Sequence, residues 1–256
     1  MPPVDSSAEN WPAVEEFLRA RGAAETHHPG GTLLEHLIRV ARLLGEWGAA
    51  PDLRAAGLCH AVYGTDGFGQ ALADTSERAH LVELIGERAE AWVHLYASCD
   101  RGVVYPRLGS GRPVLFRDRF TGRDHPLSEA DARAFLEVTA ANELDVLTHD
   151  AELADRHGPA LYRLFTASRD LLSTAARDAC VRTLGRYAPD AGPTIRITDT
   201  PHDQILAALA ANGVPVEEGP VPRTGARGPI TSTYLRAPDG NLIEISTYDE
   251  EDHPRQ

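Results

Sequence analysis

The chain has 256 residues, of which 42% are hydrophobic and 25% charged, a composition typical of a globular protein with a packed core and not of a disordered chain. Its formal net charge of −13 argues against nucleic acid or anionic lipid as a partner, because an acidic surface repels phosphate groups. No apolar run approaches the roughly eighteen residues of a membrane span, and the start lacks a signal-peptide pattern. The three cysteines show no CxxC spacing, so we expect reduced thiols and a cytoplasmic protein.

The first part of the chain predicts a series of amphipathic helices. Residues 11–22 carry apolar side chains at helical spacing, and residues 32–48 have apolar positions that step by three and four along one face. Thr32 and Glu35 fit a capping box at the start of this second helix. Residues 51–64 open on a proline and are apolar nearly all round, which favours a central, buried helix.

Three more helical regions are expected further along the chain. Residues 76–97 predict one long helix, whereas residues 101–127 look irregular, with room for a small hairpin. Residues 128–147 predict a helix capped by Ser128, and residues 159–186 predict one or two more. This part of the chain therefore reads as all-α.

The pattern changes near residue 190. Residues 188–193 form a Pro/Gly/Asp linker, and beyond it short segments alternate apolar and polar residues with a period of two, interrupted by one helix. The sequence predicts an α+β protein with two domains. These are an all-α helical bundle over residues 1–190 and a βαβββ half-barrel over residues 191–256, which is small for independent stability.

Two histidines lie on consecutive predicted helices. His36 lies in the middle of one helix and His60 late in the next, and antiparallel packing of the two helices could bring the imidazoles together. A later helix carries Asn142, Glu143 and Asp145. Imidazoles and a carboxylate on facing helices are a usual way to build a metal site in a helical bundle. The alternative is that both histidines are ordinary core residues.

The stretch TLLEHLIRVARLLGEWG followed by LRAAGLCHAVYG resembles the HD-domain superfamily of metal-dependent hydrolases and oxygenases, over about residues 26–150. The resemblance implies that His36 and His60 bind metal, with Asp145 as the aspartate ligand. Where the family has an aspartate after its second histidine, this chain has Ala61. The departure implies one divalent metal and not two, with Fe(II) favoured and Zn(II) or Mn(II) as alternatives.

Other polar residues are expected near the same end of the bundle. His28 precedes the helix of the first histidine and is a candidate acid or base. Tyr63, Asp66 and Glu90 are the other catalytic candidates, and Arg101 is a candidate to bind a substrate carboxylate or phosphate. The alternatives are a surface turn for His28 and a structural salt bridge for Arg101.

The pattern S-x-Y-x-R-x-P-D-G-N-L-I-E-I-S at residues 232–246 resembles one βαβββ module of the glyoxalase/bleomycin-resistance/extradiol-dioxygenase (vicinal oxygen chelate) superfamily. Because one module is half of the usual cup, the resemblance implies a homodimer through this module or packing against the helical domain. Glu244 matches the metal-binding glutamate of that family, but the first strand offers no histidine or glutamine, so we favour a non-metal role. Arg223 and Tyr234 are then candidates to contact an acidic ligand.

The two resemblances together imply a metal-dependent enzyme that acts on a small molecule. We favour a non-haem iron oxygenase, since two histidines and a carboxylate leave positions open for O2 and substrate on iron. An HD-type hydrolase is the first alternative; it is less favoured because the family's second aspartate is missing and the chain has no lysine to hold phosphate. A non-catalytic protein that binds or sequesters a ligand through the glyoxalase-like module is the second.

Overall fold

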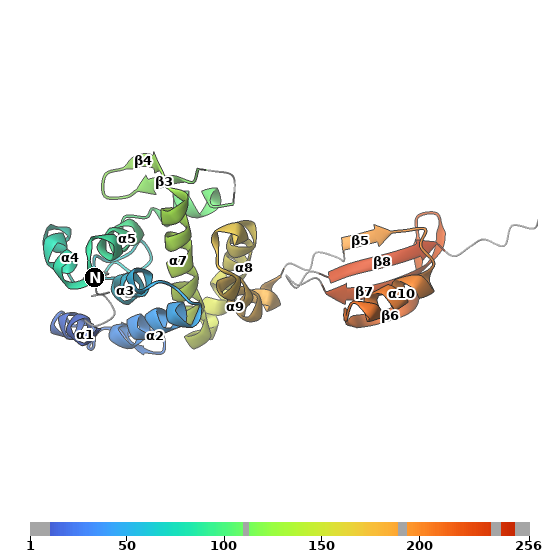
Figure 1. Cartoon of the computed structure of the whole chain (residues 1–256), viewed down its shortest axis with the longest axis horizontal. Helices are drawn as coiled ribbons and strands as arrows, with labels where there is room; N and C mark the ends of the chain where they lie inside the picture. The colour runs from blue at the N-terminus through green and yellow to red at the C-terminus, as the bar shows by residue number, and fades with distance from the viewer. Residues whose placement is uncertain (1–10, 110–112, 189–193, 237–241, 249–256) are drawn as a thin grey trace, which may run out of the picture. The chain divides into compact units, whose positions relative to one another are not determined.

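The computed structural model describes residues 11–109, 113–188, 194–236 and 242–248. The chain divides into two compact units, Met1–Leu184 and Gly185–Gln256. Helices dominate the first and a sheet dominates the second (Figure 1), so the protein combines helix and sheet as the α+β prediction requires. The boundary that we predicted between residues 190 and 191 lies outside the described residues. No described helix is long and apolar enough to cross a membrane.

The first unit consists of helices with two short hairpins. Its elements are α1 (Trp11–Ala20), β1 (His27–His28), β2 (Gly31–Thr32), α2 (Leu33–Glu46), α3 (Pro51–Cys59), η1 (Thr75–Glu77), α4 (Arg78–Ile85), α5 (Glu87–Ala97), α6 (Arg101–Val104), η2 (Tyr105–Arg107), β3 (Leu115–Asp118), β4 (Arg123–Pro126), α7 (Glu129–His149), α8 (Ala151–Ala167), η3 (Arg169–Leu171) and α9 (Thr174–Leu184). β3–β4 is the small antiparallel hairpin for which residues 101–127 left room, whereas the antiparallel pair β1–β2 was not expected in an all-α unit.

Helix α7 is the central element of this unit. It packs against α2, α3 and α5 as well as against α8 and α9, and it stands between these groups in Figure 1. Ser128 caps it as predicted, with its hydroxyl accepting a hydrogen bond from the Asp131 backbone. Residues all around α7 are buried, including Glu137, Asn142 and Asp145. A helix surrounded on all sides can present polar groups only to other elements of the core.

Helices α2 and α3 bring the two predicted histidines close together. α2 begins with the predicted capping box, in which Thr32 and Glu35 each accept a hydrogen bond from the other's backbone N–H. α3 packs on α2 through Gly57, where an added Cβ would lie 2.3 Å from a methyl carbon of Leu44. α3 ends at Cys59, earlier than predicted, so His60 follows the helix instead of lying within it.

Two further helix predictions need correction. The expected helix over residues 76–97 is broken into α4 and α5 by Gly86, whose φ of 87° is strained for any residue with a side chain. The region expected to start at residue 159 begins at Ala151, where Asp150 caps α8, and Pro159 lies inside that helix. Both errors come from breaker residues, whose effect depends on their context.

The second unit is the predicted βαβββ unit. It contains η4 (Gly185–Tyr187), β5 (Thr194–Ile197), α10 (His202–Ala211), β6 (Val216–Gly225), β7 (Gly228–Arg236) and β8 (Leu242–Tyr248). The strand order is β5-β8-β7-β6, with β5 parallel to β8 and the other pairs antiparallel. Ile205 of α10 is buried, as are Ile230 and Leu235 of β7, so α10 and the sheet supply a small core.

The hairpin β1–β2 turns at Pro29 and Gly30 and lies against the end of α7. Gly30 has a φ of 78°, and an added Cβ would lie 2.5 Å from the His149 ring. Gly48 has nearly the same φ, 79°, with nothing within 4 Å of an added Cβ. Alanine at Gly48 would therefore add backbone strain alone, whereas alanine at Gly30 would add both backbone strain and crowding against His149.

We predict that Gly48→Ala lowers the free energy of unfolding by about 1–2 kcal/mol, the usual cost of a left-handed conformation for a residue with a Cβ. Gly30→Ala should lower it by about a further 1 kcal/mol or more, because the His149 ring must also move. Urea denaturation of both variants measures the difference. Equal losses would show that the hairpin does not press against α7.

Candidate functional site

A cavity of about 450 Å³ lies in the first unit and holds four of the predicted site residues. Its walls come from the hairpin β1–β2, the start of α2, the turn after α3, α6, η2, α7 and α8. The predicted residues that line it are His28, His36, His60 and Arg101. Asn142 and Glu143 of α7 and Tyr105 of η2 lie in the same wall.

His60 is held as a neutral imidazole with a defined orientation. Its Nδ1 donates a hydrogen bond of 2.7 Å to the Gly57 carbonyl, so the lone pair is on Nε2. Burial, together with the nearby His36, lowers the pKa of His60 to about 3. The Nε2 atom lies 3.0 Å from the side-chain oxygen of Asn142. Two electron-pair donors thus face each other in the core.

His36 points its own Nε2 at the same amide. Its Nδ1 lies 2.7 Å from Asp145 Oδ2, and its Nε2 lies 3.1 Å from the Asn142 oxygen. The His36 and His60 rings meet edge to face, with centroids 5.3 Å apart. Antiparallel packing of α2 and α3 therefore brings the two imidazoles together, with both Nε2 atoms converging on one side chain of α7.

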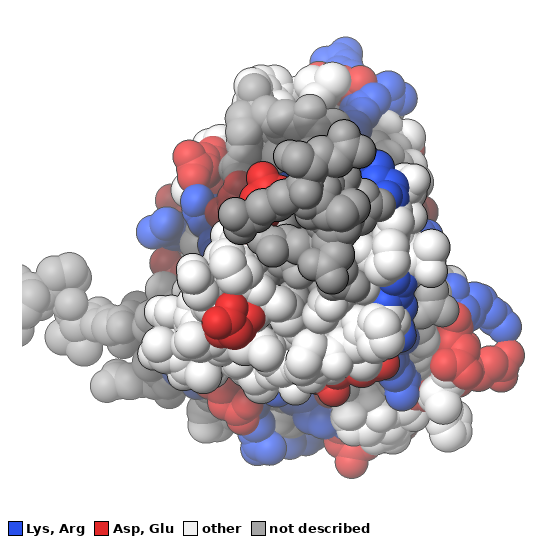
Figure 2. All heavy atoms as spheres, turned by 90° about the vertical axis from the view of Figure 1, so that its right-hand side faces the viewer, with Lys and Arg blue, Asp and Glu red and all other residues white. Residues whose placement is uncertain are grey.

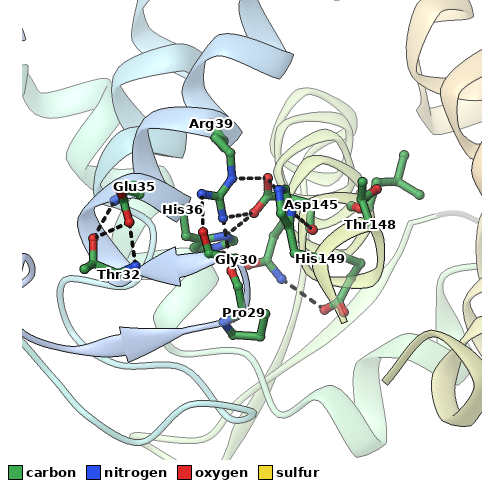
Figure 3. Close-up of polar contacts among 12 residues, drawn as sticks. Pro29, Gly30, Thr32, Glu35, His36, Arg39, Asp145, Thr148 and His149 are labelled. Carbon is green, nitrogen blue, oxygen red and sulfur yellow. Dashed lines mark hydrogen bonds and ion pairs between the residues drawn. The ribbon is translucent and has the colours of Figure 1, made fainter. Parts of the chain in front are cut away.

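Asp145 occupies a different position from the one that we expected. It contacts Nδ1 of His36, on the side of the ring away from the two Nε2 atoms, and Arg39 holds it with contacts of 2.7 and 3.0 Å (Figure 3). Burial alone would raise the pKa of Asp145, but hydrogen bonds from His36 and Arg39 lower it. Asp145 therefore orients His36 and does not share a binding point with the Nε2 atoms.

Arg39 links this pair to the hairpin. The same guanidinium that grips Asp145 donates to the carbonyls of Pro29 and Gly30, at 3.1 and 3.3 Å (Figure 3). The hairpin in turn carries His28, whose ring stacks on His36 with centroids 3.9 Å apart. Burial and the neighbouring His36 lower the pKa of His28 to about 4, so the ring is neutral near pH 7.

Arg101 lies in the cavity wall and is already paired. One of its nitrogens lies 3.0 Å from Glu143 Oε1, and the other donates to the Tyr96 hydroxyl at 3.1 Å. Glu143 Oε1 also lies 3.2 Å from the Asn142 amide nitrogen. Asp66, a predicted catalytic residue, accepts a hydrogen bond of 2.9 Å from the Arg101 backbone N–H and is not among the residues that line the cavity. In this position it fixes the start of α6.

Tyr63 and Glu90 are brought together, but away from this cavity. The Tyr63 hydroxyl donates to Glu90 at 3.0 Å, and Arg78 binds both Glu90 oxygens at 2.7 Å. Neither Tyr63 nor Glu90 lines the cavity. Buried Glu90 and half-exposed Arg78 form an ion pair that fastens α4 to α5, so the structure does not place Tyr63 and Glu90 where catalysis at the histidines would need them.

The remaining predicted residues belong to the second unit. Arg223 of β6 donates to the Tyr234 hydroxyl of β7 at 3.2 Å and pairs with Glu218 at 2.9 Å. Glu244 is buried and accepts hydrogen bonds from Ser232 and Ser246, at 2.6 and 3.1 Å. Among the described residues, its side-chain partners are therefore two hydroxyl groups and not a cation.

Arg39 and Tyr105 escaped the sequence argument, and Asn142 was named on its helix without being given a role in the site. Asn142 precedes Asp145 by three positions, and Arg39 follows His36 by three, so each shares a helix face with a predicted residue. That spacing was the available signal for both. Tyr105 lay in a region that looked irregular and carried no such signal.

Comparison with known proteins gives short matches. A family described as a domain of unknown function (DUF6817) matches residues 17–101, a stretch that contains His36 and His60 but not Asn142. The virulence protein STM3117 of Salmonella typhimurium is 48% identical over 63 residues, which are 25% of this chain and 44% of that protein. The glyoxalase domain-containing protein RDO1 of Mycosarcoma maydis is 58% identical over 50 residues, 18% of this chain and 28% of that protein.

Solved structures give matches of similar extent. The crystal structure of the Salmonella virulence protein shares 48% identity over 24% of this chain and 48% of that chain, with a TM-score of 0.23. An integron cassette protein from V. cholerae shares 51% identity over 23% of this chain and 46% of that chain, with a TM-score of 0.22.

The chain thus spans less than half the length of each relative it matches. The match to a glyoxalase domain-containing protein indicates a glyoxalase-like segment in this chain. The HD-domain resemblance stays a prediction.

We predict that Arg39→Gln lowers the free energy of unfolding by about 2–3 kcal/mol, because it leaves the buried Asp145 carboxylate with fewer donors. The double variant, Arg39→Gln with Asp145→Asn, should lose at least about 1 kcal/mol less free energy of unfolding than the sum of the losses in the two single variants, as expected for directly interacting groups. Urea denaturation of the four proteins gives this coupling.

The control is Arg19→Gln, which removes an exposed ion pair with Glu15 and should cost less than about 0.5 kcal/mol. Additive effects of Arg39→Gln and Asp145→Asn would contradict the close pairing of these side chains.

Proposed function

We propose that the first unit is a metal-dependent enzyme that acts on a small molecule, with one divalent ion bound between His36, His60 and Asn142. The observation that carries the proposal is the meeting of His60 Nε2 and the Asn142 oxygen, with His36 Nε2 directed at the same point. Electron pairs that face each other in a buried site repel, and a cation between them converts that repulsion into attraction.

The donor groups fit such an ion. Histidines that bind metals usually donate their other ring N–H to a carbonyl or a carboxylate, and here Gly57 and Asp145 accept these bonds. Among the described residues, no group of three or more His, Cys, Asp and Glu side chains is arranged around a common point. The proposed set is therefore two imidazoles and one amide oxygen, which suits Fe(II), Zn(II) or Mn(II).

A bound ion would supply a Lewis acid beside the cavity. Asp145 would keep His36 oriented, and Arg39 would hold Asp145 in place. Glu143, beside Asn142 and at the cavity wall, is the carboxylate in position to take a proton from a bound molecule. His28, neutral and stacked on His36, is a second candidate acid or base.

Among metal-dependent reactions we favour the non-haem iron oxygenase. A phosphohydrolase needs free cations to hold phosphate, whereas Arg101 and Arg39 are engaged by Glu143 and Asp145 and the chain has no lysine. The hydrolase remains the second candidate for the same metal.

A non-catalytic ligand-binding protein is the alternative of another class. It is favoured by the glyoxalase-like segment and by the adjacent Arg223 and Tyr234 of the second unit. Metal content separates the two classes, because the binding function assigned to the second unit needs no ion.

We further propose a homodimer through the second unit. Ile195 and Ile197 are 59% and 53% exposed and lie two residues apart on the edge strand β5, so they share one face. In Figure 2, many of the described residues nearest the viewer are uncharged, and some acidic and basic side chains lie among them. A surface of that kind suits a protein partner better than nucleic acid. The fragment of residues 191–256 alone should not be a stable monomer.

We predict about one metal ion per chain after anaerobic loading with Fe(II), Zn(II) or Mn(II), measured by elemental analysis. His36→Ala and His60→Ala should abolish the uptake, and Asp145→Asn should weaken it by about 10- to 100-fold as loss of an orienting partner does. Ala61→Asp should raise the stoichiometry towards two.

The matched control is His80→Ala, which removes an exposed histidine of α4 and should leave the metal content unchanged. Circular dichroism should show helical content preserved in each variant. Full metal content in His60→Ala, or no uptake by the parent protein under any loading, would overturn the proposal and favour core histidines.

For the dimer, sedimentation velocity should show two chains per particle for the parent protein and one for the variant that combines Ile195→Asp with Ile197→Asp, since charges buried in an apolar interface oppose association. Leu115→Asp, at an exposed leucine of the first unit, is the control and should stay dimeric. A monomeric parent protein would refute this proposal.

A further inference from the structure

The cavity contains two buried polar atoms that lack a hydrogen-bond partner among the described residues. These are the Tyr105 hydroxyl and His28 Nδ1, and both residues line the cavity. A buried polar group without a partner costs about 1–3 kcal/mol, and folded proteins leave few of them. Two such atoms in one small cavity indicate positions where a bound molecule completes the hydrogen bonds.

The charges of the cavity wall are already balanced. Arg101 is the only Arg or Lys among the described lining residues and Glu143 the only Asp or Glu, and they pair with each other at 3.0 Å. An ionised ligand would have to compete with an existing ion pair for Arg101.

Apolar side chains make up much of the remaining wall. Leu33, Phe68, Val146, Leu153 and Leu161 line the cavity. Its volume of about 450 Å³ is in the usual range for a small organic molecule, about 300–1,000 Å³. The combination of apolar walls with a few polar atoms is typical of sites that bind largely apolar ligands and orient them by single hydrogen bonds.

We infer that this cavity binds an uncharged organic molecule that carries a carbonyl or hydroxyl oxygen, and that the Tyr105 hydroxyl donates a hydrogen bond to that oxygen. Burial raises the pKa of Tyr105, so its hydroxyl keeps its proton and serves as a donor. His28 Nδ1 is the second anchor, within the ring that stacks on His36. Tyr105 is therefore assigned a specificity role that sets the substrate class of the proposed enzyme.

The inference rests on the proposed use of this cavity as a small-molecule site, but it does not need the metal. The test uses 4-fluoroacetophenone as the uncharged oxygen-bearing probe, 1-ethyl-4-fluorobenzene as its oxygen-free match and 4-fluorophenyl phosphate as the ionised one. Fluorine NMR titration of the full-length protein measures the three affinities, with and without a chelator. In the chelator-treated, metal-free protein the carbonyl probe should bind more tightly than either of the others.

Tyr105→Phe removes only the hydroxyl. It should weaken binding of the carbonyl probe about five- to tenfold, as expected for one hydrogen bond, and leave the affinity for the oxygen-free probe unchanged. Because the hydroxyl has no partner in the free protein, Tm should stay the same or rise. A hydroxyl with a structural partner would instead give a lower Tm. Tyr248→Phe, the same change in the second unit, is the control and should alter neither affinity nor Tm.

Several results would overturn the inference. These are tightest binding of the phosphate probe by the metal-free protein, no binding of the carbonyl probe, equal affinities of Tyr105→Phe and the parent protein for the carbonyl probe, or a lower Tm of Tyr105→Phe. Failure of the proposed metal function has a different signature, since it would appear as absent metal in the parent protein while the carbonyl probe still depends on Tyr105.

Discussion

The buried carboxylate of Asp145 is the interaction on which the candidate site depends. It accepts hydrogen bonds from Nδ1 of His36 and from two nitrogens of Arg39 (Figure 3). Arg39 also donates hydrogen bonds to two backbone carbonyls of the hairpin β1–β2. A carboxylate buried in a helical core is stable only with such donors. These contacts join α2, α7 and the hairpin, and they fix which nitrogen of His36 faces the cavity.

The rest of the cavity follows the same principle of local charge pairing. Arg101 pairs with Glu143 in its wall, and in the same unit Arg78 pairs with Glu90. Because these ionised groups satisfy one another, the rest of the cavity is left to imidazoles, one amide and apolar side chains. A site of this composition can hold a divalent ion through imidazole nitrogens, and it discriminates between ligands by single hydrogen bonds and shape more than by charge.

Sequence patterns predicted the local structure best where the signals were local. The capping box of α2, the Ser128 cap of α7 and the βαβββ order of the second unit were all predicted and are confirmed. The predictions failed at helix ends. Gly86 breaks the chain between α4 and α5, and α3 ends before His60 and not beyond it. A glycine can continue a helix or break it, and only its neighbours in space decide between these outcomes.

The sequence by itself indicated that His36 and His60 belong to neighbouring helical segments that could bring the two imidazoles together, because helical periodicity and a short connection leave few other arrangements. It also determined the glyoxalase-like pattern of residues 232–246. Only the tertiary structure decided that Asp145 stands behind His36, that Asn142 faces both Nε2 atoms, and that Tyr63 and Glu90 form a separate pair. Residues three apart on a buried helix share a face in the sequence pattern. Which of them points at a given atom depends on how the surrounding helices pack, and that packing is a property of the whole core.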